Sequence, residues 1–326
     1  MKVLIKTKNW EDEDQNKIID LVFEQWKNRR SNITLEQTNN WFKRLDLENT
    51  SKSITATIND ELIGWLLFVK HSNSEAEINP WALNGHPILS KESRDQIETS
   101  SLLLKEAIKQ AEKEQVHRLE LSFMKNIPYN LKNEKIYTSL GMRLIEQTCH
   151  MRQNLENFSL PEINIPAKFK ITPISQISKN DFYKCFYNVF RTSEDEWMLD
   201  KSDSEIKDHF ESDVYNNHFE LISDASICLI DNGGNLMAFT VLRKSHGEKN
   251  GHIWIIGVDT NYRKQGIGRN LLNLVKSKLI EMEYKSISLN VNLTNKPAYD
   301  LYCKTGFQEE WIQYNYAWTN KITNLK

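Results

Sequence analysis

The sequence predicts an α/β fold of the mixed (α+β) kind, with two tandem lobes that each contain a mixed, mostly antiparallel sheet flanked by helices. Three observations predict it. Each half of the chain carries a β-hairpin signal, each continues with a strand, a helix and another strand, and the same order recurs on both sides of a proline-containing segment. A hairpin joins antiparallel strands and a helical crossover joins parallel ones, so each sheet must be mixed.

Turn residues between apolar runs mark the two hairpins. In the second half, Asn232-Gly233-Gly234-Asn235 separates residues 225–230 from residues 236–242, which is a strong hairpin signal. The corresponding segments of the first half are residues 53–58, Asn59-Asp60-Glu61 and residues 62–69.

The remaining elements also occur twice. A long amphipathic helix is followed by a strand and then by a short helix that contains a tyrosine. In the second half these are residues 267–282, residues 286–292 and the helix with Tyr302; in the first half they are residues 95–113, residues 118–123 and the helix with Tyr137. Each half opens with a strand and a helix, at residues 3–5 and 15–29 and at residues 169–174 and 181–190.

The proline-containing segment sets the expected domain boundaries. We predict a first domain at residues 1–155, a linker at residues 156–167 and a second domain at residues 168–326. A chain of 326 residues is long for one domain and sufficient for two.

Composition excludes several classes of protein. The formal net charge of −2 argues against general nucleic-acid binding, because such proteins carry a basic surface. The sequence shows no secretory signal and no apolar run long enough to cross a bilayer. Its 4 cysteines form no metal-binding pattern and are expected to be reduced thiols. We expect a cytoplasmic monomer or homodimer that binds no metal, nucleic acid or membrane.

Residues 258–269 are the most informative segment. They join a strand to the long helix of the second half through a basic loop that contains Gly266 and Gly268. Such a junction aims main-chain N–H groups and a helix N-terminus at one place, where they can hold a phosphate. The two glycines permit close approach of the backbone. The positive charges around them are those of Arg263, Lys264 and Arg269.

A second motif, Asn295-x-x-Ala298-x-x-Leu301-Tyr302-x-x-x-Gly306-Phe307, follows this loop. Together with Arg263-x-x-Gly266-x-Gly268 it resembles the signature of the GNAT (Gcn5-related N-acetyltransferase) superfamily. The detailed resemblance covers about residues 168 to 318. The fainter repeat indicates that residues 1–155 are a second, degenerate lobe of the same kind.

The resemblance implies acetyl-CoA as co-substrate and transfer of its acetyl group to an amine by direct attack. It also implies that the strand ending at Val258 parts from its neighbour, so that free backbone groups pair with the pantetheine arm and polarise the thioester carbonyl. Asn295 would bind the pantetheine arm, cap the helix before Pro297, or do both. The implied cofactor-binding residues are Ile256, Gly257, Val258, Arg263, Lys264, Gln265, Gly266, Ile267, Gly268, Arg269 and Asn295.

Two residues are candidates for proton transfer. The resemblance places Tyr302 as the general acid that protonates the leaving CoA thiolate. The alternative is a tyrosine that only packs the short helix, which the matching Tyr137 favours. His252 stands where the resemblance places a general base, and an imidazole titrates in the useful range. The alternative is an ordinary histidine at the end of a strand.

The first lobe departs from the motif at the expected phosphate site. Residues 94–99 align approximately with residues 263–268, so that Ile97 and Thr99 replace the two glycines. The negative charges nearby are Asp95 and Glu98. Side chains there would block a pyrophosphate and carboxylates would repel it. We therefore expect only the second lobe to bind acetyl-CoA.

These observations predict an acyl-CoA-dependent N-acetyltransferase that forms a ternary complex with a small-molecule or peptide amine. Two alternatives stay open: a non-catalytic sensor that binds acyl-CoA, and a transferase of longer acyl or aminoacyl groups. Further candidate residues are the acidic Glu194, Asp195, Glu196 and Glu220, for a cationic acceptor, and Trp81 in the first lobe.

Overall fold

A computed structural model describes residues 2–27, 32–45, 47, 51–72, 74–80, 83–124, 134–159, 162–163, 165, 169–192, 202–215, 219–245 and 249–320. The candidates Trp81, Glu194, Asp195 and Glu196, and parts of the expected linker, lie outside these residues. The chain divides into two compact units. Unit 1 comprises Met1–Glu146 and Gln313–Lys326, and unit 2 comprises Gln147–Ile312.

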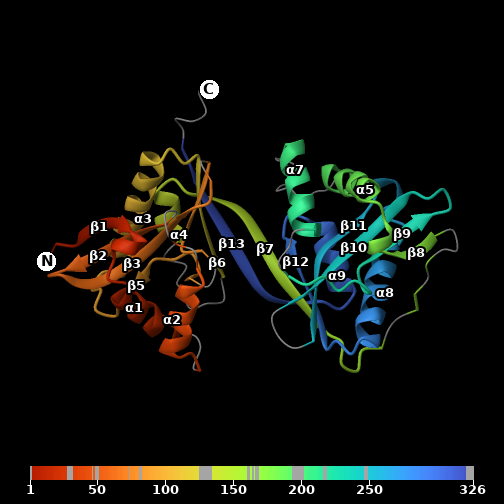
Figure 1. Cartoon of the computed structure of the whole chain (residues 1–326), viewed down its shortest axis with the longest axis horizontal. Coiled ribbons are helices and arrows are strands. Elements are labelled where there is room, and N and C mark those ends of the chain that lie inside the picture. Colours follow the sequence, from red (N-terminus) through yellow and green to blue (C-terminus); the bar gives the residue numbers. More distant parts are fainter. Residues whose placement is uncertain are drawn as a thin grey trace. The chain divides into compact units, whose positions relative to one another are not determined.

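Unit 1 contains the elements expected in the first half and several shorter ones (Figure 1). They are β1 (Leu4–Asn9), α1 (Gln15–Lys27), α2 (Leu35–Lys43), β2 (Ser51–Ile58), β3 (Glu61–Lys70), β4 (Glu75–Ile78), β5 (Ile88–Leu89), α3 (Gln96–Lys113), β6 (Arg118–Met124), α4 (Glu134–Ser139), the start of β7 (Arg143–Asn154) and the end of β13 (Gln308–Thr319). The strand order of this unit is β1–β2–β3–β4–β6–β13.

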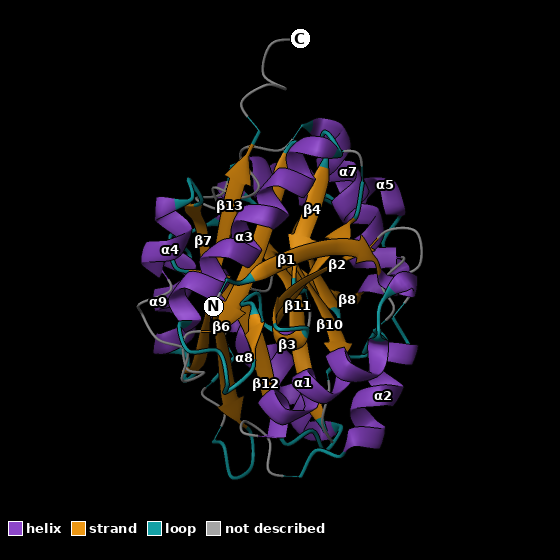
Figure 2. Ribbon diagram, turned by 90° about the vertical axis from the view of Figure 1, so that its left-hand side faces the viewer, coloured by secondary structure: helices purple, strands orange, loops and turns teal. Residues whose placement is uncertain are grey.

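Unit 2 repeats this plan. Its further elements are β8 (Phe169–Pro173), α5 (Lys179–Arg191), α7 (Asp203–Phe210), β9 (Ile227–Asp231), β10 (Leu236–Lys244), β11 (Asn250–Val258), α8 (Ile267–Glu281), β12 (Ser286–Asn292) and α9 (Lys296–Lys304). The strand order of this unit is β7–β12–β11–β10–β9–β8. Figure 2 shows the strands and helices together, and each unit combines antiparallel and parallel strand pairs, so the predicted fold class is confirmed.

The predicted hairpins and crossovers are present in both units. Strands β2 and β3 pair antiparallel around Asn59 and Asp60, whose φ angles of 50° and 65° suit a tight hairpin turn. Strands β9 and β10 pair in the same way. The crossover pairs β4–β6 and β11–β12 are parallel, as a strand–helix–strand connection requires.

Helices cover both faces of the sheet in unit 2. Neighbouring residues of a strand point to opposite faces, and the adjacent Ala238 and Phe239 of β10 belong to two different core clusters. The cluster that contains Ala238 includes Leu271, Val275 and Leu279 of α8. The cluster that contains Phe239 includes Phe182 and Phe186 of α5 and Phe210 of α7.

The two compact units differ from the predicted domain boundaries because two strands are exchanged in sequence order. Residues 147–155 belong to unit 2, where Thr148–Asn154 of β7 pair antiparallel with β12. Residues 313–326 belong to unit 1, where Gln313–Thr319 of β13 pair antiparallel with β6. Each unit therefore completes its sheet with a strand that the sequence assigns to the other half.

Cys149, Cys185, Cys228 and Cys303 are all free thiols, and the first three are buried. Within the described ranges, no helix has both the length and the apolar character needed to cross a membrane.

The exchange of strands predicts which fragment folds. A chain of residues 143–312 keeps β7 beside β12, whereas a chain of residues 156–312 leaves the edge of β12 unpaired and removes the buried Cys149 and Met151 from the core. We expect a cooperative urea transition, followed by circular dichroism, for the longer fragment and aggregation or no transition for the shorter one. Equal transition midpoints for the two fragments would contradict this account.

Candidate functional site

Strand β11 parts from β12 halfway along its length. The two strands pair in parallel from Asn250 and Ser286 to Ile253 and Leu289, yet β11 continues to Val258. Beyond Ile253 the backbone groups of β11 on this side have no strand partner among the described residues. Unpaired backbone groups seek a hydrogen-bonding partner, so this opening is suited to an extended ligand. The opening implied by the sequence is therefore present.

A bulge in β11 coincides with this opening. On the other side of the strand, Ile253 pairs with Leu242 and Ile255 pairs with Val241, which leaves Trp254 as an extra residue. Bulges re-aim side chains and are frequent beside active sites. The Trp254 side chain packs against the core cluster beneath α5 and α7.

The loop after β11 presents an uncapped helix N-terminus. Lys264 and Gly266 have positive φ angles of 60° and 78°, and α8 begins at Ile267 without any side-chain cap. The first N–H groups of α8 are therefore open to a ligand, and such a concave run of N–H groups attracts anions. Three side chains with exposed positions surround it: Lys264, Gln265 and Arg269.

Two glycines near the opening allow elements to pack closely. A Cβ atom at Gly257 would lie 2.8 Å from Phe239 Cζ and 2.8 Å from Val189 Cγ1, so glycine lets α5 approach β11. A Cβ atom at Gly268 would lie 3.2 Å from Leu301 Cδ2, so glycine also lets α8 approach α9. The two glycines therefore allow the helices beside the opening to pack closely.

Arg263 holds the loop in place. Its guanidinium donates hydrogen bonds to the carbonyl oxygens of Val258 (3.0 Å), Thr192 (2.6 Å) and Val189 (2.9 Å). Two of these carbonyls lie at the C-terminus of α5, where cations are favourable. These main-chain contacts position the loop, and contact of Arg263 with phosphate stays a prediction.

Asn295 caps α9. Its Oδ1 accepts a hydrogen bond from the Ala298 N–H at 3.3 Å, and Pro297 lies in the first turn of the helix. The Nδ2 group makes no hydrogen bond with any residue that the structure describes. Capping and ligand binding are therefore compatible for this side chain.

The corresponding tyrosines of the two units differ in their hydroxyl groups. Tyr137 hydrogen-bonds with Nδ1 of His86. Tyr302 is only 6% exposed, yet its hydroxyl makes no hydrogen bond with any described residue. Burial raises the pKa of Tyr302 well above its ordinary value, so the phenol stays protonated and can donate.

The equivalent opening in unit 1 is filled by the chain itself. Strand β4 pairs with β6 only as far as Leu121. Beyond it, the Met124 N–H donates to Asn84 Oδ1 at 2.9 Å, and Gly85 lies so close to Ser122 that a Cβ atom would collide with its carbonyl oxygen. His86 adds the contact with the tyrosine of α4. These residues lie beyond the end of the β4–β6 pairing, at the position that corresponds to the opening between β11 and β12 in unit 2.

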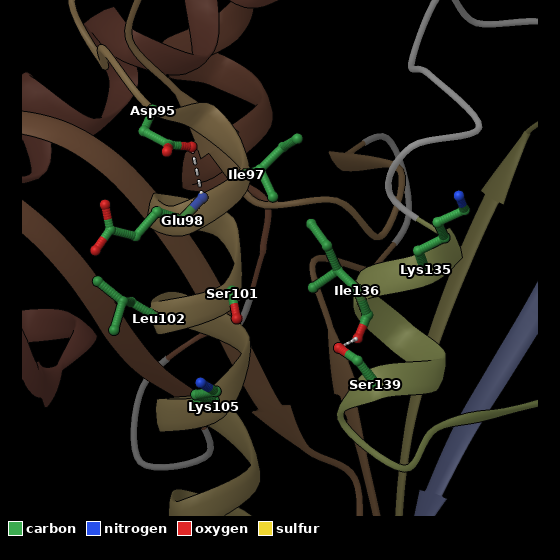
Figure 3. Close-up of a pocket in the computed structure, with 9 residues that line it drawn as sticks. All are labelled: Asp95, Ile97, Glu98, Ser101, Leu102, Lys105, Lys135, Ile136 and Ser139. Carbon is green, nitrogen blue, oxygen red and sulfur yellow. Dashed lines mark hydrogen bonds between the residues drawn. The ribbon is translucent and has the colours of Figure 1, made fainter.

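The N-terminus of α3 in unit 1 is also closed. The Asp95 carboxylate accepts a hydrogen bond from the Glu98 N–H at 2.9 Å and so caps the helix (Figure 3). A pocket of about 750 Å³ lies between α3 and α4, where Ile97 and Ile136 point toward one another. This pocket is lined by apolar and acidic groups as well as by lysines, and its helix N-terminus already holds a carboxylate.

His252 is part of a partly buried polar row on unit 2. Its Nδ1 hydrogen-bonds with Ser288 Oγ at 2.9 Å, and its ring stacks on His150 with centroids 5.8 Å apart. His150 contacts Asn290 and stacks on Trp311. Burial, and secondarily the nearby His150 and Arg152, lower the pKa of His252 to about 4. The expectation of an imidazole that titrates near neutrality is therefore wrong.

The π-helical turn that follows α7 was not predicted from the sequence. Asp213 lies in this π-helical turn, Glu211–Tyr215, and burial raises the pKa of its carboxyl. Such turns are rare in proteins, and those that occur are often at functional sites. No local motif marks this one in the sequence. The predicted acidic candidate Glu220 is an exposed surface residue that pairs with Lys244 at 2.6 Å.

Comparison with known proteins indicates the family of unit 2 and the fold of both units. Residues 186–307 match the model of the acetyltransferase (GNAT) family. Unit 2 is a GNAT domain. The matched residues all lie within unit 2. A stretch of 68 residues is 32% identical to N-alpha-acetyltransferase 30 of Homo sapiens and to that of Mus musculus, covering 21% of this chain and only 19% of those relatives.

Solved structures extend the likeness in fold to both units. A GCN5-related N-acetyltransferase from Sphaerobacter thermophilus has a TM-score of 0.65 at 12% identity, over 97% of this chain and 95% of that one. A tandem GNAT protein from the clavulanic acid biosynthesis pathway has a TM-score of 0.58 at 11% identity, over 98% of each chain. At these identities the likeness establishes the tandem GNAT fold and nothing finer.

The lowered pKa of His252 predicts that the native chain and His252→Gln differ in how their stability depends on pH. Between pH 4 and 6.5 the unfolded state binds more protons than the folded state, so the free energy of unfolding rises with pH across this window. His252→Gln removes this dependence. We expect its stability relative to the native chain to improve by roughly 2 kcal/mol between pH 7 and pH 4.5, measured by urea unfolding.

The control is His71→Gln, because the hydrogen bond to Glu77 raises the pKa of His71. A raised pKa gives stability that is present at low pH and lost as pH rises. The free energy of unfolding of this variant, relative to the native chain, should therefore fall between pH 7 and pH 4.5. Parallel pH profiles for the native chain and His252→Gln would contradict the buried, neutral state of His252.

Proposed function

We propose that this protein is an N-acetyltransferase in which unit 2 transfers the acetyl group of acetyl-CoA to an amine by direct attack in a ternary complex. One observation carries the proposal. In unit 2 the opening between β11 and β12 and the N-terminus of α8 are both free. In unit 1 the chain fills the opening and a carboxylate caps the helix.

The cofactor would extend along the opening. Main-chain N–H groups from Gly266 to Arg269 would hold the pyrophosphate, with positive charge from Lys264 and Arg269. Backbone groups of Ile256–Val258 would pair with the pantetheine arm, and the free Nδ2 group of Asn295 would donate to it. Within the described residues the β11 groups on the open side have no strand partner and the Asn295 Nδ2 group has no hydrogen-bonding partner, which supports a ligand of this length and polarity.

The same geometry supports the chemistry. The acceptor nitrogen attacks the thioester carbonyl carbon, the C–N bond forms, and the C–S bond breaks as CoA leaves. Unpaired N–H groups of β11 beyond Ile253 would stabilise the oxyanion as it develops. Tyr302 would donate a hydrogen bond or its proton to the departing sulfur, because burial keeps its hydroxyl protonated.

The paired tyrosines give the test of this proposal. Release of free thiol from acetyl-CoA is measured with ethylamine, spermidine and alanine amide, the last as a surrogate for a peptide N-terminus. With the amine that is turned over, Tyr302→Phe should lower kcat by about 100-fold while leaving the Kd of acetyl-CoA unchanged. The matched control is Tyr137→Phe, which removes a hydroxyl already bonded to His86 and should leave kcat unchanged.

Three outcomes would count against the proposal. Binding of acetyl-CoA without turnover of any amine would favour the sensor, and a preference for long-chain acyl-CoA would favour transfer of longer groups. Equal losses of kcat in the two tyrosine variants would show that the phenol contributes only to packing.

A further inference from the structure

The carboxyl end of α9, which carries Tyr302, closes with a Schellman motif. The N–H of Phe307 donates to the carbonyl oxygen of Tyr302 (3.1 Å), and the N–H of Gly306 donates to that of Cys303 (3.1 Å). Gly306 has a φ angle of 99°, in the left-handed region that this motif uses. The rings of Phe307 and Tyr302 pack with their centroids 5.9 Å apart. The turn after α9 therefore holds both the backbone and the ring of Tyr302.

A buried lysine binds the last carbonyl group of this helix. The Nζ group of Lys276, in α8, donates to the carbonyl oxygen of Thr305 at 2.6 Å and lies over the ring of Phe307, 4.9 Å from its centroid. The ring of Phe158 offers a second aromatic face at 5.4 Å. A cation is favourable at a helix C-terminus, where carbonyl groups lack N–H partners. One ammonium group therefore contacts the end of α9 and the ring that packs on Tyr302.

This lysine occupies an otherwise apolar position of α8. Its side chain is fully buried, at 0% exposed, and its neighbours along the inner face of the helix are Leu272, Val275 and Leu279. Among the residues that the structure describes, no carboxylate forms an ion pair with Lys276. A buried charge without a counter-charge costs stability. A contribution to the stability of the fold therefore does not explain a lysine at this position.

Unit 1 closes the corresponding helix with the same motif. At the end of α4 the N–H of Met142 donates to the carbonyl oxygen of Tyr137 (3.0 Å), and the N–H of Gly141 donates to that of Thr138 (3.1 Å). The carbonyl oxygen of the C-cap residue, Leu140, accepts no side-chain hydrogen bond within the described ranges. The motif therefore forms without a bound cation.

The long helix of unit 1, α3, has no buried charge like that of Lys276. The buried residues of α3 are all uncharged, and its three lysines, Lys105, Lys109 and Lys113, are exposed. Unit 1 also fills its own opening with Asn84. The buried ammonium group thus occurs in the unit whose opening is free and whose tyrosine hydroxyl has no partner among the described residues.

We infer that Lys276 is a positioning residue for the proposed acetyl transfer: its ammonium group holds the end of α9 so that the Tyr302 hydroxyl is directed at the departing sulfur. The inference rests on the role proposed for Tyr302. Lys276 acts only through α9, because its Nζ group is enclosed by the Thr305 carbonyl and two phenylalanine rings. A fixed α8–α9 pair gives the phenol one position, and proton donation depends on such alignment.

The same burial makes this position sensitive to pH. Removal from water lowers the pKa of the Lys276 ammonium to about 8. The groups that face it are the Thr305 carbonyl and the rings of Phe158 and Phe307, none of which is charged. Above this pKa the neutral amine loses its cation–π contacts and becomes a weaker donor to Thr305. The contribution of Lys276 to kcat should therefore decline as the pH rises through about 8.

The lowered pKa also predicts how stability depends on pH. The pKa of Lys276 falls from its ordinary 10.5 to about 8 in the folded state, so between these values the unfolded state binds more protons. The free energy of unfolding of the native chain, relative to Lys276→Met, should therefore rise with pH in this window. Below it the buried charge costs stability, so Lys276→Met should unfold at no lower urea concentration than the native chain.

The test compares Lys276→Met with Lys278→Met, a matched control whose side chain is 39% exposed on the same helix. Methionine keeps the length of the side chain and removes its charge and donor. With the amine that is turned over, Lys276→Met should lower kcat about 10-fold, and leave the KM of the amine and the Kd of acetyl-CoA unchanged. Lys276→Arg keeps a charge and a donor and should recover part of the loss. Lys278→Met should leave kcat unchanged.

A double variant shows whether Lys276 acts through Tyr302. If it does, Lys276→Met combined with Tyr302→Phe should lower kcat no further than Tyr302→Phe alone, because the phenol is already absent. The kcat of the native chain divided by that of Lys276→Met should also fall as the pH rises through about 8. The same ratio for Lys278→Met should stay constant.

The outcomes separate this inference from the proposed function. A lower kcat in Lys276→Met, with an undiminished urea midpoint and no further loss in the double variant, supports the inference. Unchanged kcat in Lys276→Met, or losses that multiply in the double variant, would overturn it while the proposed acetyl transfer stands. A Lys276→Met chain that no longer folds would assign the lysine to the fold itself and would also overturn it. Failure of the native chain with every amine would remove the proposed function, and the inference with it.

Discussion

Parallel strands that stop pairing leave main-chain N–H and C=O groups that must find other partners, and this constraint organises both units. In unit 2, β11 and β12 part after Ile253 and Leu289, and the groups beyond remain free of strand partners within the described ranges. The bulge at Trp254 lies at the same point. Irregular backbone of this kind costs stability unless something compensates for it, and a bound ligand is the natural compensation. The roles proposed for the α8 loop and for Tyr302 both depend on this opening.

Unit 1 meets the same constraint with its own residues. Asn84 bonds the free N–H of Met124, and His86 bonds the hydroxyl of Tyr137. The N-terminus of α3 is likewise satisfied by Asp95. The repeated fold therefore has one open site, in unit 2, and one closed site, in unit 1. Unit 1 makes internal contacts at the positions that are open in unit 2.

Local signals in the sequence predicted most of the fold. The turn residues Asn59-Asp60 and Asn232–Asn235 predicted both hairpins, and apolar periodicity predicted α3 and α8. The exchange of β7 and β13 between the sequence halves was missed, because strand partners are chosen by contacts far apart in the chain. The two units accordingly differ from the boundaries that the linker indicated.

The site was predictable only in part, for the same reason. Motif spacing located the α8 loop and Tyr302, but it could not show that main-chain carbonyls occupy Arg263 or that burial lowers the pKa of His252. The π-helical turn Glu211–Tyr215 likewise lacked any sequence signal. Charge and burial around a residue arise from tertiary packing and are not encoded locally.

The central claim is that the chain holds one cofactor site, at the opening of unit 2. Isothermal titration of the full chain with acetyl-CoA tests it most directly, with Gly266→Glu and Ile97→Glu as matched variants at the starts of α8 and α3. No atom lies within 4 Å of a Cβ placed at Gly266, so the glutamate has room and costs on the order of 1 kcal/mol in backbone strain. The account predicts one acetyl-CoA per native chain, none for Gly266→Glu and one for Ile97→Glu. Two molecules per chain, or normal binding by Gly266→Glu, would contradict it.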